Sequence, residues 1–258
     1  MSLDGQVAII TGAGSDGQGR ATAKLFAEAG AKIVVTDINE PGVEETAAMV
    51  NAAHRGSTVA VIADVAEATQ VRSVVDTAIS RFGRLDCLIN NAGIVLWKTI
   101  DDTSEEEWDH VVDVDLKSVF LFSKYAIPHM RKVGGGSIVN ISSFSGLAGQ
   151  KRHVAYCAAK TGVVAVTKCL ALDHGPENIR TNCICPGAIA TDMLRLGVNF
   201  DEAEGRARLE GHIPLRRVAS SEEVASVSLF LCSKAASYIN GAILPVDGGI
   251  SAGVARTG

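Results

Sequence analysis

Short runs of apolar, often β-branched residues alternate along this chain with longer stretches whose apolar residues recur at helical spacing. Strands that are apolar throughout are typical of a parallel sheet, because the helices between successive strands cover both of its faces. We therefore predict an α/β fold. The expected strands are 7–11, 32–36, 58–63, 85–89, 137–141, 180–185 and 242–246, and the expected helices are 18–29, 41–53, 67–82, 104–131, 155–173 and 221–232.

No linker, block of like charge or internal repeat divides the chain, so we predict a single domain over residues 1–258. The segment 192–213 breaks the alternation after Pro186 and Gly187. Its pattern indicates a loop with one short helix. An extra segment at the C-terminal edge of a doubly wound sheet is well placed to act as a substrate lid.

The composition narrows the class of protein. A chain of 258 residues with 47% hydrophobic content can bury a large core. The net charge of −5, with acids and bases interspersed, gives no footprint for nucleic acid or an anionic membrane. The first residues lack a signal-peptide pattern, and no apolar run approaches the ~20 residues that span a bilayer. We expect a cytoplasmic protein without nucleic-acid or membrane partners.

Cysteine and histidine spacing suggests neither disulfides nor a metal centre. The six cysteines form no C-x-x-C pair, and we interpret them as buried free thiols in a reducing cytosol. The six histidines are scattered without ligand spacing, so we predict no metal site.

The stretch from Ile141 to Lys160 carries the candidate chemistry. Tyr156 and Lys160 are four residues apart, which places both side chains on one face of a helix. A lysine ammonium one turn away lowers the pKa of a tyrosine, and the pair could then move the proton of an alcohol. Ser143 follows an apolar strand and could face Tyr156 across a cleft. Taken alone, Tyr-x-x-x-Lys is more often an ordinary pair on a helix surface.

A glycine-rich turn, from Thr11 to Gly19, joins the first expected strand to a helix. Its glycines let the backbone approach a pyrophosphate, whose charge then lies at the helix N-terminus. Asp37 ends the second strand, where a carboxylate accepts hydrogen bonds from an adenosine ribose and repels a 2′-phosphate. The combination predicts NAD rather than NADP. The alternative for Asp37 is a simple cap of the strand end.

The residues at two further strand ends are also suited to binding NAD. Asp64 and Val65 follow the third strand, where an adenine would lie. The small and polar residues 90–93 follow the fourth, where they would let the chain pass close to a cofactor and connect neighbouring loops. Each of these, taken alone, is only an Asx-type turn.

In this order the motifs resemble the short-chain dehydrogenase/reductase family, specifically its NAD-binding branch. The resemblance covers residues 7–249 and implies a Rossmann-type parallel sheet of seven strands in the order 3-2-1-4-5-6-7. It also implies hydride transfer between NAD and a secondary alcohol or ketone. The motifs that carry it are the glycine-rich turn, Asn90-Asn91-Ala92-Gly93, Ser143, Tyr156-x-x-x-Lys160 and Asn182-x-x-x-Pro186-Gly187-x-x-x-Thr191.

The resemblance implies roles for individual residues. Tyr156 is the expected acid–base, Lys160 lowers its pKa and holds the nicotinamide ribose, and Ser143 positions the substrate oxygen. The expected cofactor-binding residues are Gly12, Ser15, Gln18, Gly19, Asp37, Ile38, Asp64, Val65, Asn91, Gly93, Tyr156, Lys160, Pro186, Gly187, Ile189 and Thr191.

The chain departs from the family pattern at two places. Gly12 and Gly17 are separated by one residue more than usual, with Asp16 as the insertion, and we expect its carboxylate to point to solvent. Asp115 occupies a catalytic position where the family usually has an asparagine that holds a relay water near the lysine. Its carboxylate can still accept a hydrogen bond from water, but it adds charge.

Two helices are expected to form a subunit interface. The helix 155–173 is apolar or small on nearly every face, so core or another subunit must cover it on both sides. The helix 104–131 would pair with it, with Pro128 ending or kinking the regular turn. The resemblance implies a four-helix contact and a homotetramer.

The expected substrate is a largely apolar secondary alcohol or ketone, because the pocket would lack a fixed cation for a carboxylate or phosphate. Two alternatives remain open. One is a reductase of carrier-bound 3-oxoacyl groups, and the other is a non-catalytic NAD-binding regulator that kept only the fold. The expected pocket residues are Ile94, Val95, Leu96, Trp97, Phe144, Val154, Met193, Leu194, Leu196 and Phe200.

Overall fold

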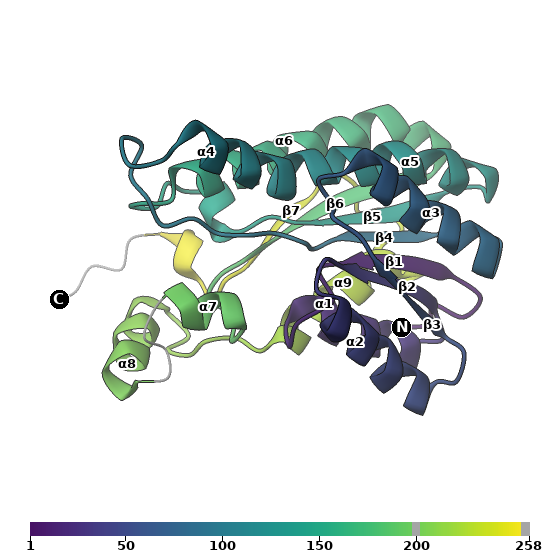
Figure 1. Cartoon of the computed structure of the whole chain (residues 1–258), viewed down its shortest axis with the longest axis horizontal. Coiled ribbons are helices and arrows are strands. Elements are labelled where there is room, and N and C mark those ends of the chain that lie inside the picture. The colour runs from purple at the N-terminus through teal and green to yellow at the C-terminus, as the bar shows by residue number, and fades with distance from the viewer. Residues whose placement is uncertain (198–201, 254–258) are drawn as a thin grey trace.

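One parallel sheet of seven strands forms the centre of the protein, in the order β3-β2-β1-β4-β5-β6-β7 (Figure 1). The structure is a computed structural model that describes residues 1–197 and 202–253. Every neighbouring pair of strands is parallel, which confirms the predicted fold class and strand order. The strands are β1 (Val7–Thr11), β2 (Lys32–Asp37), β3 (Thr58–Ile62), β4 (Cys87–Asn90), β5 (Gly136–Ile141), β6 (Ile179–Pro186) and β7 (Ile243–Val246).

Helices cover both faces of the sheet, as parallel crossovers require. In Figure 1 one layer lies below the sheet and another above it. The lower layer consists of α1 (Gln18–Glu28), α2 (Glu40–Ala53) and α9 (Ser221–Cys232), and the upper layer of α3 (Ala68–Phe82), α4 (Glu105–Val112), α5 (Ser118–Lys132) and α6 (Val154–His174). The short helices α7 (Asp192–Gly197) and α8 (Ala203–His212) project beyond the carboxyl ends of the strands.

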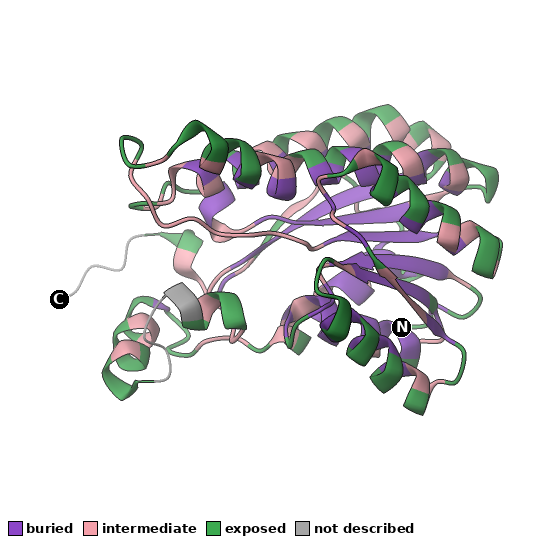
Figure 2. Ribbon diagram, viewed as in Figure 1, coloured by how far each residue is buried: buried purple, intermediate pink, exposed green. Residues whose placement is uncertain are grey.

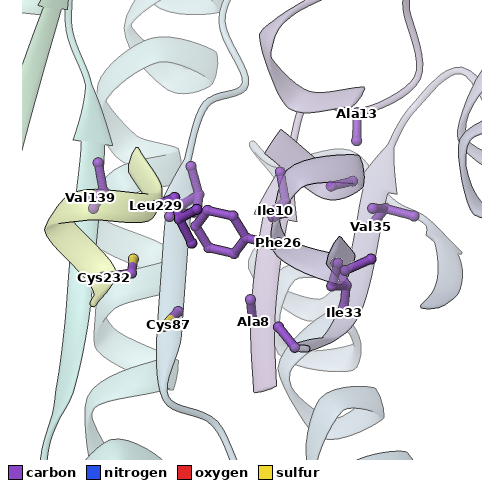
Figure 3. Close-up of a cluster of buried hydrophobic side chains, with 14 of the residues drawn as sticks. Ala8, Ile10, Ala13, Phe26, Ile33, Val35, Cys87, Val139, Leu229 and Cys232 are labelled. Carbon is purple, nitrogen blue, oxygen red and sulfur yellow. The ribbon is translucent and has the colours of Figure 1, made fainter. Parts of the chain in front are cut away.

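Alternate residues of the central strands enter two different hydrophobic clusters. In β1, Ala8 and Ile10 pack towards α1 and α9, whereas Val7 and Ile9 pack towards α3 and α5. Phe26 of α1 is fully buried in the first cluster (Figure 3). Burying a side chain of this size contributes about 1.5–3 kcal/mol. The central strands therefore form a buried layer (Figure 2), and the carboxyl ends of the strands present the loops described below.

The expected long helix 104–131 is interrupted. α4 ends at Val112, a π-helical turn spans Asp113–Lys117, and α5 follows. Pro128 does not end the helix, which continues to Lys132 because Ile127 and Met130 remain packed in the core. Single π turns widen a helix locally and are frequent at functional sites. Here the turn carries Asp115.

The 192–213 segment contains α7 and α8 rather than the one helix expected. No residue of α8 is buried, so this helix is held by few contacts with the body of the protein. Phe200, one of the expected pocket residues, lies outside the described residues, and so does the side chain of Leu196.

The core of this chain covers only one side of α6, so the expectation that core or another subunit covers both sides stays a prediction for the other side. Ala155, Ala159 and Val163 are buried, but a stripe on the opposite side is exposed. Leu172, at 78% exposure, is the most exposed large apolar residue of that stripe. Cys169 is exposed as well, so the prediction of buried thiols holds for Cys87, Cys183, Cys185 and Cys232 but not for this residue.

Within residues 1–197 and 202–253, one helical segment, Val154–Glu177, is long and apolar enough to cross a membrane by length and composition alone. This corrects the expectation that no apolar run approaches such a length. The segment consists of α6 and the turn after it, and Val163 packs against Cys183 and Cys185 of β6. A helix that lies on the sheet in this way needs an apolar face for the core.

Candidate active site

A cavity of about 560 Å³ opens at the carboxyl ends of the strands. In a doubly wound sheet this edge is where ligands bind, at the point where the strand order reverses. Here the reversal lies between β1 and β4. The glycine-rich turn and Asp37 line the cavity together with Ser143, Tyr156 and Lys160. Most of the predicted cofactor-binding and catalytic residues therefore line one continuous space.

The turn after β1 is shaped to approach an anion. Gly12 has a φ of +68°, and a Cβ there would lie 2.8 Å from the Cα of Ala92. α1 begins after Gly17 with no side-chain cap and no acidic residue in its first turn, so its amide groups remain available. Asp16 is exposed, as expected. These features fit the pyrophosphate of a dinucleotide.

Asp37 is held against this turn. Its Oδ2 accepts a hydrogen bond from the amide of Gly14 at 2.8 Å, and its Oδ1 accepts one from the amide of Asn39 at 2.9 Å. The Asn39 side chain donates in turn to the carbonyl of Gly14 at 2.8 Å. The carboxylate is thus fixed at the cavity wall with lone pairs left to accept from ribose hydroxyls.

The loop after β4 is tied to the glycine-rich turn. The hydroxyl of Thr11 accepts hydrogen bonds from the amides of Asn91 and Ala92, both at 2.9 Å. The Asn91 side chain donates to the carbonyl oxygens of Thr11 and Gly12. The polar residues at this strand end therefore connect neighbouring loops, as their positions predicted.

Tyr156, Lys160 and Ser143 converge from two elements. α6 places the Lys160 ammonium 5.6 Å from the centre of the Tyr156 ring. Ser143 follows β5 and caps a short 3₁₀ turn, where its hydroxyl oxygen accepts from the amide of Ser145 at 3.1 Å. The phenol, the ammonium and the hydroxyl therefore line the same wall.

Asp115 lies behind this group and forms a buried ion pair. Its Oδ2 is 3.2 Å from Lys160 Nζ, with side-chain exposures of 0% and 4% for the acid and the lysine. Oδ1 accepts from the amide of Ile94 at 2.7 Å, and Lys160 also donates to the carbonyl of Ile141 at 3.2 Å. Oδ2 accepts no further hydrogen bond from the described residues. The π-helical turn thus brings a carboxylate into direct contact with the lysine.

Burial and this carboxylate set the proton affinities of the site. Burial raises the pKa of Tyr156 above its ordinary value, and although Lys160 and the Ser143 hydroxyl act against this, Asp115 reinforces it. Burial alone would lower the pKa of Lys160, but Asp115 and Tyr156 outweigh it and raise that pKa. Burial also raises the pKa of Asp115, against the influence of Lys160. In the ligand-free protein Tyr156 is therefore a weaker acid than the Tyr–Lys spacing alone suggests.

Most, but not all, of the predicted site residues line the cavity. Gly19 packs against the turn itself, and Asp115 lies behind Lys160. Ile38 is 70% exposed, Asp64 caps its own loop, and Val65 is buried in the core. The roles of all the predicted site residues in cofactor binding and catalysis stay predictions. The predicted residues on the cavity wall are Gly12, Ser15, Gln18, Asp37, Asn91, Gly93, Ser143, Tyr156, Lys160, Pro186, Gly187, Ile189 and Thr191.

The substrate end of the cavity is partly as expected. Ile94 and Leu96 pack beside α6 instead of lining it, and Val154 is also absent from its wall. Several residues that line the cavity were not predicted from the sequence. For Gln150 the one available signal was its position as a polar residue shortly before Tyr156. The expected apolar residues present are Val95, Trp97, Phe144, Met193 and Leu194, and the missed residues include Asn39, Ser145, Gln150, Leu209 and Ile250.

No group of three or more His, Cys, Asp or Glu residues in the described ranges, 1–197 and 202–253, could hold a metal ion. That the protein has no metal site stays a prediction from the sequence.

Comparisons with known proteins agree with this geometry. A family model described as enoyl-(acyl carrier protein) reductase matches residues 12–251. The meso-2,3-butanediol dehydrogenase of Serratia marcescens is 40% identical and aligns over 98% of this chain and 97% of its own.

Solved structures give the same result. Levodione reductase superposes with a TM-score of 0.91 at 38% identity, covering 97% of this chain and 99% of the other. The 3-ketoacyl-(acyl-carrier-protein) reductase of Brucella melitensis, complexed with NADH, superposes with a TM-score of 0.89 at 36% identity, covering 97% and 100%. With this similarity over nearly the whole chain, and with the seven-stranded order and the Tyr-x-x-x-Lys pair on one cavity, the chain belongs to the short-chain dehydrogenase/reductase family.

Proposed function

We propose that the protein is an NAD-dependent oxidoreductase that transfers a hydride between the nicotinamide and an apolar secondary alcohol or ketone. At the coarser level it is a short-chain oxidoreductase of alcohols or ketones, like the relatives above. The observation that carries the proposal is the single cavity that joins Asp37 and the glycine-rich turn to Ser143, Tyr156 and Lys160.

The chain's own residues supply binding and proton transfer. The amides at the start of α1 would hold the pyrophosphate, Asp37 the adenosine ribose, and Lys160 the nicotinamide ribose. When bound, the nicotinamide supplies the hydride acceptor or donor. Ser143 donates a hydrogen bond to the substrate oxygen. Tyr156 takes the hydroxyl proton when an alcohol is oxidised and returns it when a ketone is reduced.

Substitution of Tyr156 tests this assignment. Tyr156→Phe keeps the ring but removes the transferable proton, so turnover should fall by about 10²–10⁴-fold. The dissociation constant for NADH, measured by its fluorescence, should stay close to that of the wild type. Lys160→Met should lose both turnover and cofactor affinity, because one ammonium serves both. Near-normal turnover in Tyr156→Phe would contradict the proposal.

The cofactor preference follows from Asp37. Among the described residues, Lys160 is the only lysine or arginine on the cavity wall, and it lies at the catalytic end. Nothing there offsets the repulsion between Asp37 and a 2′-phosphate. We expect NAD to be preferred over NADP by about tenfold or more in kcat/KM, roughly 1.4 kcal/mol. Asp37→Ala should reduce the difference in kcat/KM between NAD and NADP, mainly by removing the repulsion of the 2′-phosphate. Equal kcat/KM values for the two cofactors in the wild type would refute the preference.

The substrate class follows from the other end of the cavity. Val95, Trp97, Phe144, Met193 and Leu194 give it an apolar wall. Among the described residues of the wall, Lys160 is the only lysine or arginine that could pair with a substrate carboxylate or phosphate, and it is already paired with Asp115. Neutral secondary alcohols should therefore be oxidised faster than acidic ones. A panel of neutral and acidic alcohols with NAD, followed by nicotinamide absorbance, measures this directly.

The main alternative is reduction of 3-oxoacyl groups on a carrier protein. The Brucella melitensis relative favours it, and the description of the matching family model also names a carrier-bound substrate, an enoyl group. Its test is turnover of a 3-oxoacyl carrier protein with NADH and NADPH, compared with the alcohol panel. A non-catalytic regulator is the second alternative, and it would bind NAD but turn over neither substrate. The presence of Tyr156, Lys160 and Ser143 argues against it.

We further propose a cytoplasmic homotetramer that needs no metal. The exposed stripe of α6 supports the assembly, and the absence of any disulfide among the described cysteines fits a reducing compartment.

A further inference from the structure

The imidazole of His153 lines the cavity beside the catalytic tyrosine and takes no part in the proton transfer proposed above. Its ring centre is 6.3 Å from that of Tyr156 and 6.1 Å from that of Trp97, which it meets edge-on. His153 is the residue before α6, but its side chain does not cap the helix. The ring therefore lies next to the reacting phenol without a structural hydrogen bond to α6.

The backbone around His153 is held by the loop that follows β4. Lys98 and His153 pair as an isolated parallel bridge, and Arg152 Nη2 donates to the carbonyl of Trp97 at 3.2 Å. Arg152 has a φ of +64°, which residues other than glycine rarely adopt. Backbone conformations of this kind cluster at functional sites. The contacts with the second loop thus give the His153 ring a defined position on the cavity wall.

One hydrogen bond determines which ring nitrogen of His153 carries the hydrogen. Nδ1 lies 2.8 Å from the carbonyl oxygen of Lys151. A carbonyl oxygen can only accept, so Nδ1 must donate in this bond. In a neutral imidazole the other nitrogen, Nε2, is then a bare acceptor. Within residues 1–197 and 202–253, Nε2 has no hydrogen-bond partner. An acceptor on the cavity wall is therefore left for a ligand.

We propose that His153 Nε2 accepts a hydrogen bond from a second hydroxyl of the substrate, on the carbon next to the one that is oxidised. This inference rests on the proposed function and narrows its substrate to a vicinal diol, or to an α-hydroxyketone in the reverse direction. The close spacing of the two rings suits adjacent hydroxyls, of which one meets Tyr156 and the other His153.

The acceptor character of Nε2 selects the group that it binds. A hydroxyl can donate to Nε2, whereas an ether or ketone oxygen only accepts and would leave it unpaired. The carbon skeleton of the diol lies against the apolar wall described above. One carbinol loses its hydride to NAD and its hydroxyl proton to Tyr156, and the second hydroxyl is left unchanged. His153 is thus a residue that determines specificity and has no part in the proton transfer.

The first test is the position of the hydrogen on His153, measured by ¹⁵N NMR in the ligand-free protein. At about pH 9 an imidazole is neutral. The chain has six histidines, and His153→Phe identifies the signals of His153. We expect a hydrogen on Nδ1 and none on Nε2. A hydrogen on Nε2 would overturn the proposal, whatever the enzyme oxidises.

The second test is binding to the wild type with NADH bound, a complex that cannot oxidise an alcohol. The probe is cis-cyclohexane-1,2-diol, which is meso and so offers both configurations of the reacting carbon. It should shift the Nε2 signal of His153, whereas cis-2-methoxycyclohexanol should not. His212 is the control, because its Nδ1 lies 2.7 Å from the carbonyl of Arg208 but its ring is not among the described residues of the cavity wall. An unmoved Nε2 signal of His153 would contradict the proposal.

Turnover with NAD gives the third readout. In the wild type, kcat/KM for the diol should exceed that for its methyl ether and for cyclohexanol by about three- to tenfold. His153→Phe keeps an aromatic ring beside Trp97 but removes the acceptor, so this preference should disappear. His153→Gln, whose side-chain oxygen can accept, should retain most of the preference, and His212→Phe should retain all of it. Thermal melts identify variants that fail to fold.

The outcomes separate this proposal from the proposed function. A wild type that oxidises cyclohexanol as well as the diol, or an equal preference for the diol in the wild type and His153→Phe, would refute the role of His153 alone. If the wild type oxidises none of the three alcohols but the diol shifts the Nε2 signal, the proposed function is wrong and the hydroxyl-binding role of His153 stands.

Discussion

The side chain that most separates this site from the family pattern is Asp115. An asparagine there would offer Lys160 a neutral oxygen, whereas the carboxylate lies 3.2 Å from the ammonium and is fully buried. In a buried site such a charge acts strongly on its neighbours. It keeps Lys160 charged, but it also offsets the positive field that Lys160 projects onto Tyr156. His110 and Cys183 are the other titratable groups that act on this pair.

The pH dependence of alcohol oxidation should reveal this effect. Oxidation needs the Tyr156 phenolate, and Asp115 raises the pKa of Tyr156, so the acid limb of log kcat/KM lies at higher pH than an asparagine would give. Asp115→Asn should keep activity and move that limb to lower pH, because the variant removes the negative charge that raises the pKa of Tyr156. Profiles of both proteins with one alcohol at saturating NAD measure the shift. If the acid limbs of the two profiles superimpose, the charge of Asp115 has no effect on the pKa of Tyr156.

At the scale of elements, the junction of β1 and α1 depends on close backbone contact. A Cβ on Gly19 would overlap the carbonyl of Gly12, whereas one on Gly17 would meet only side-chain atoms, at 3.6 Å or more. Gly19→Ala should therefore destabilise the protein by about 1–3 kcal/mol and weaken NADH binding, because the turn must open. Gly17→Ala is the matched control for stability. Thermal melts and NADH fluorescence compare the two, and equal melting temperatures would argue against this packing role.

At the scale of the whole molecule, the exposed stripe of α6 and Phe120 of α5, at 52% exposure, offer apolar surface that a partner subunit could cover. A tetramer through α5 and α6 would cover them. Leu172→Asp should shift the assembly towards smaller species in analytical ultracentrifugation. Ile100→Asp is the control, since Ile100 is 75% exposed against 78% for Leu172 but lies outside both helices. A monomeric wild type, or equal effects of the two changes, would refute this interface.

The sequence by itself determined the features that depend on near neighbours in the chain. Strand and helix periodicity, the glycine-rich turn, Asp37 at a strand end and the spacing of Tyr156 and Lys160 are local patterns, and the structure keeps all of them. The strand order came from the family resemblance. Only the tertiary structure decided how distant segments meet: the π-helical turn that brings Asp115 to Lys160, the contact of Asn39 with Gly14, and the exposed side of α6. The hydrogen bonds from Gln150 and Ser143 to the Ser145 hydroxyl belong to the same class, since they depend on how one loop folds back on the wall of the cavity. Such contacts depend on packing in three dimensions, which no periodicity along the chain encodes.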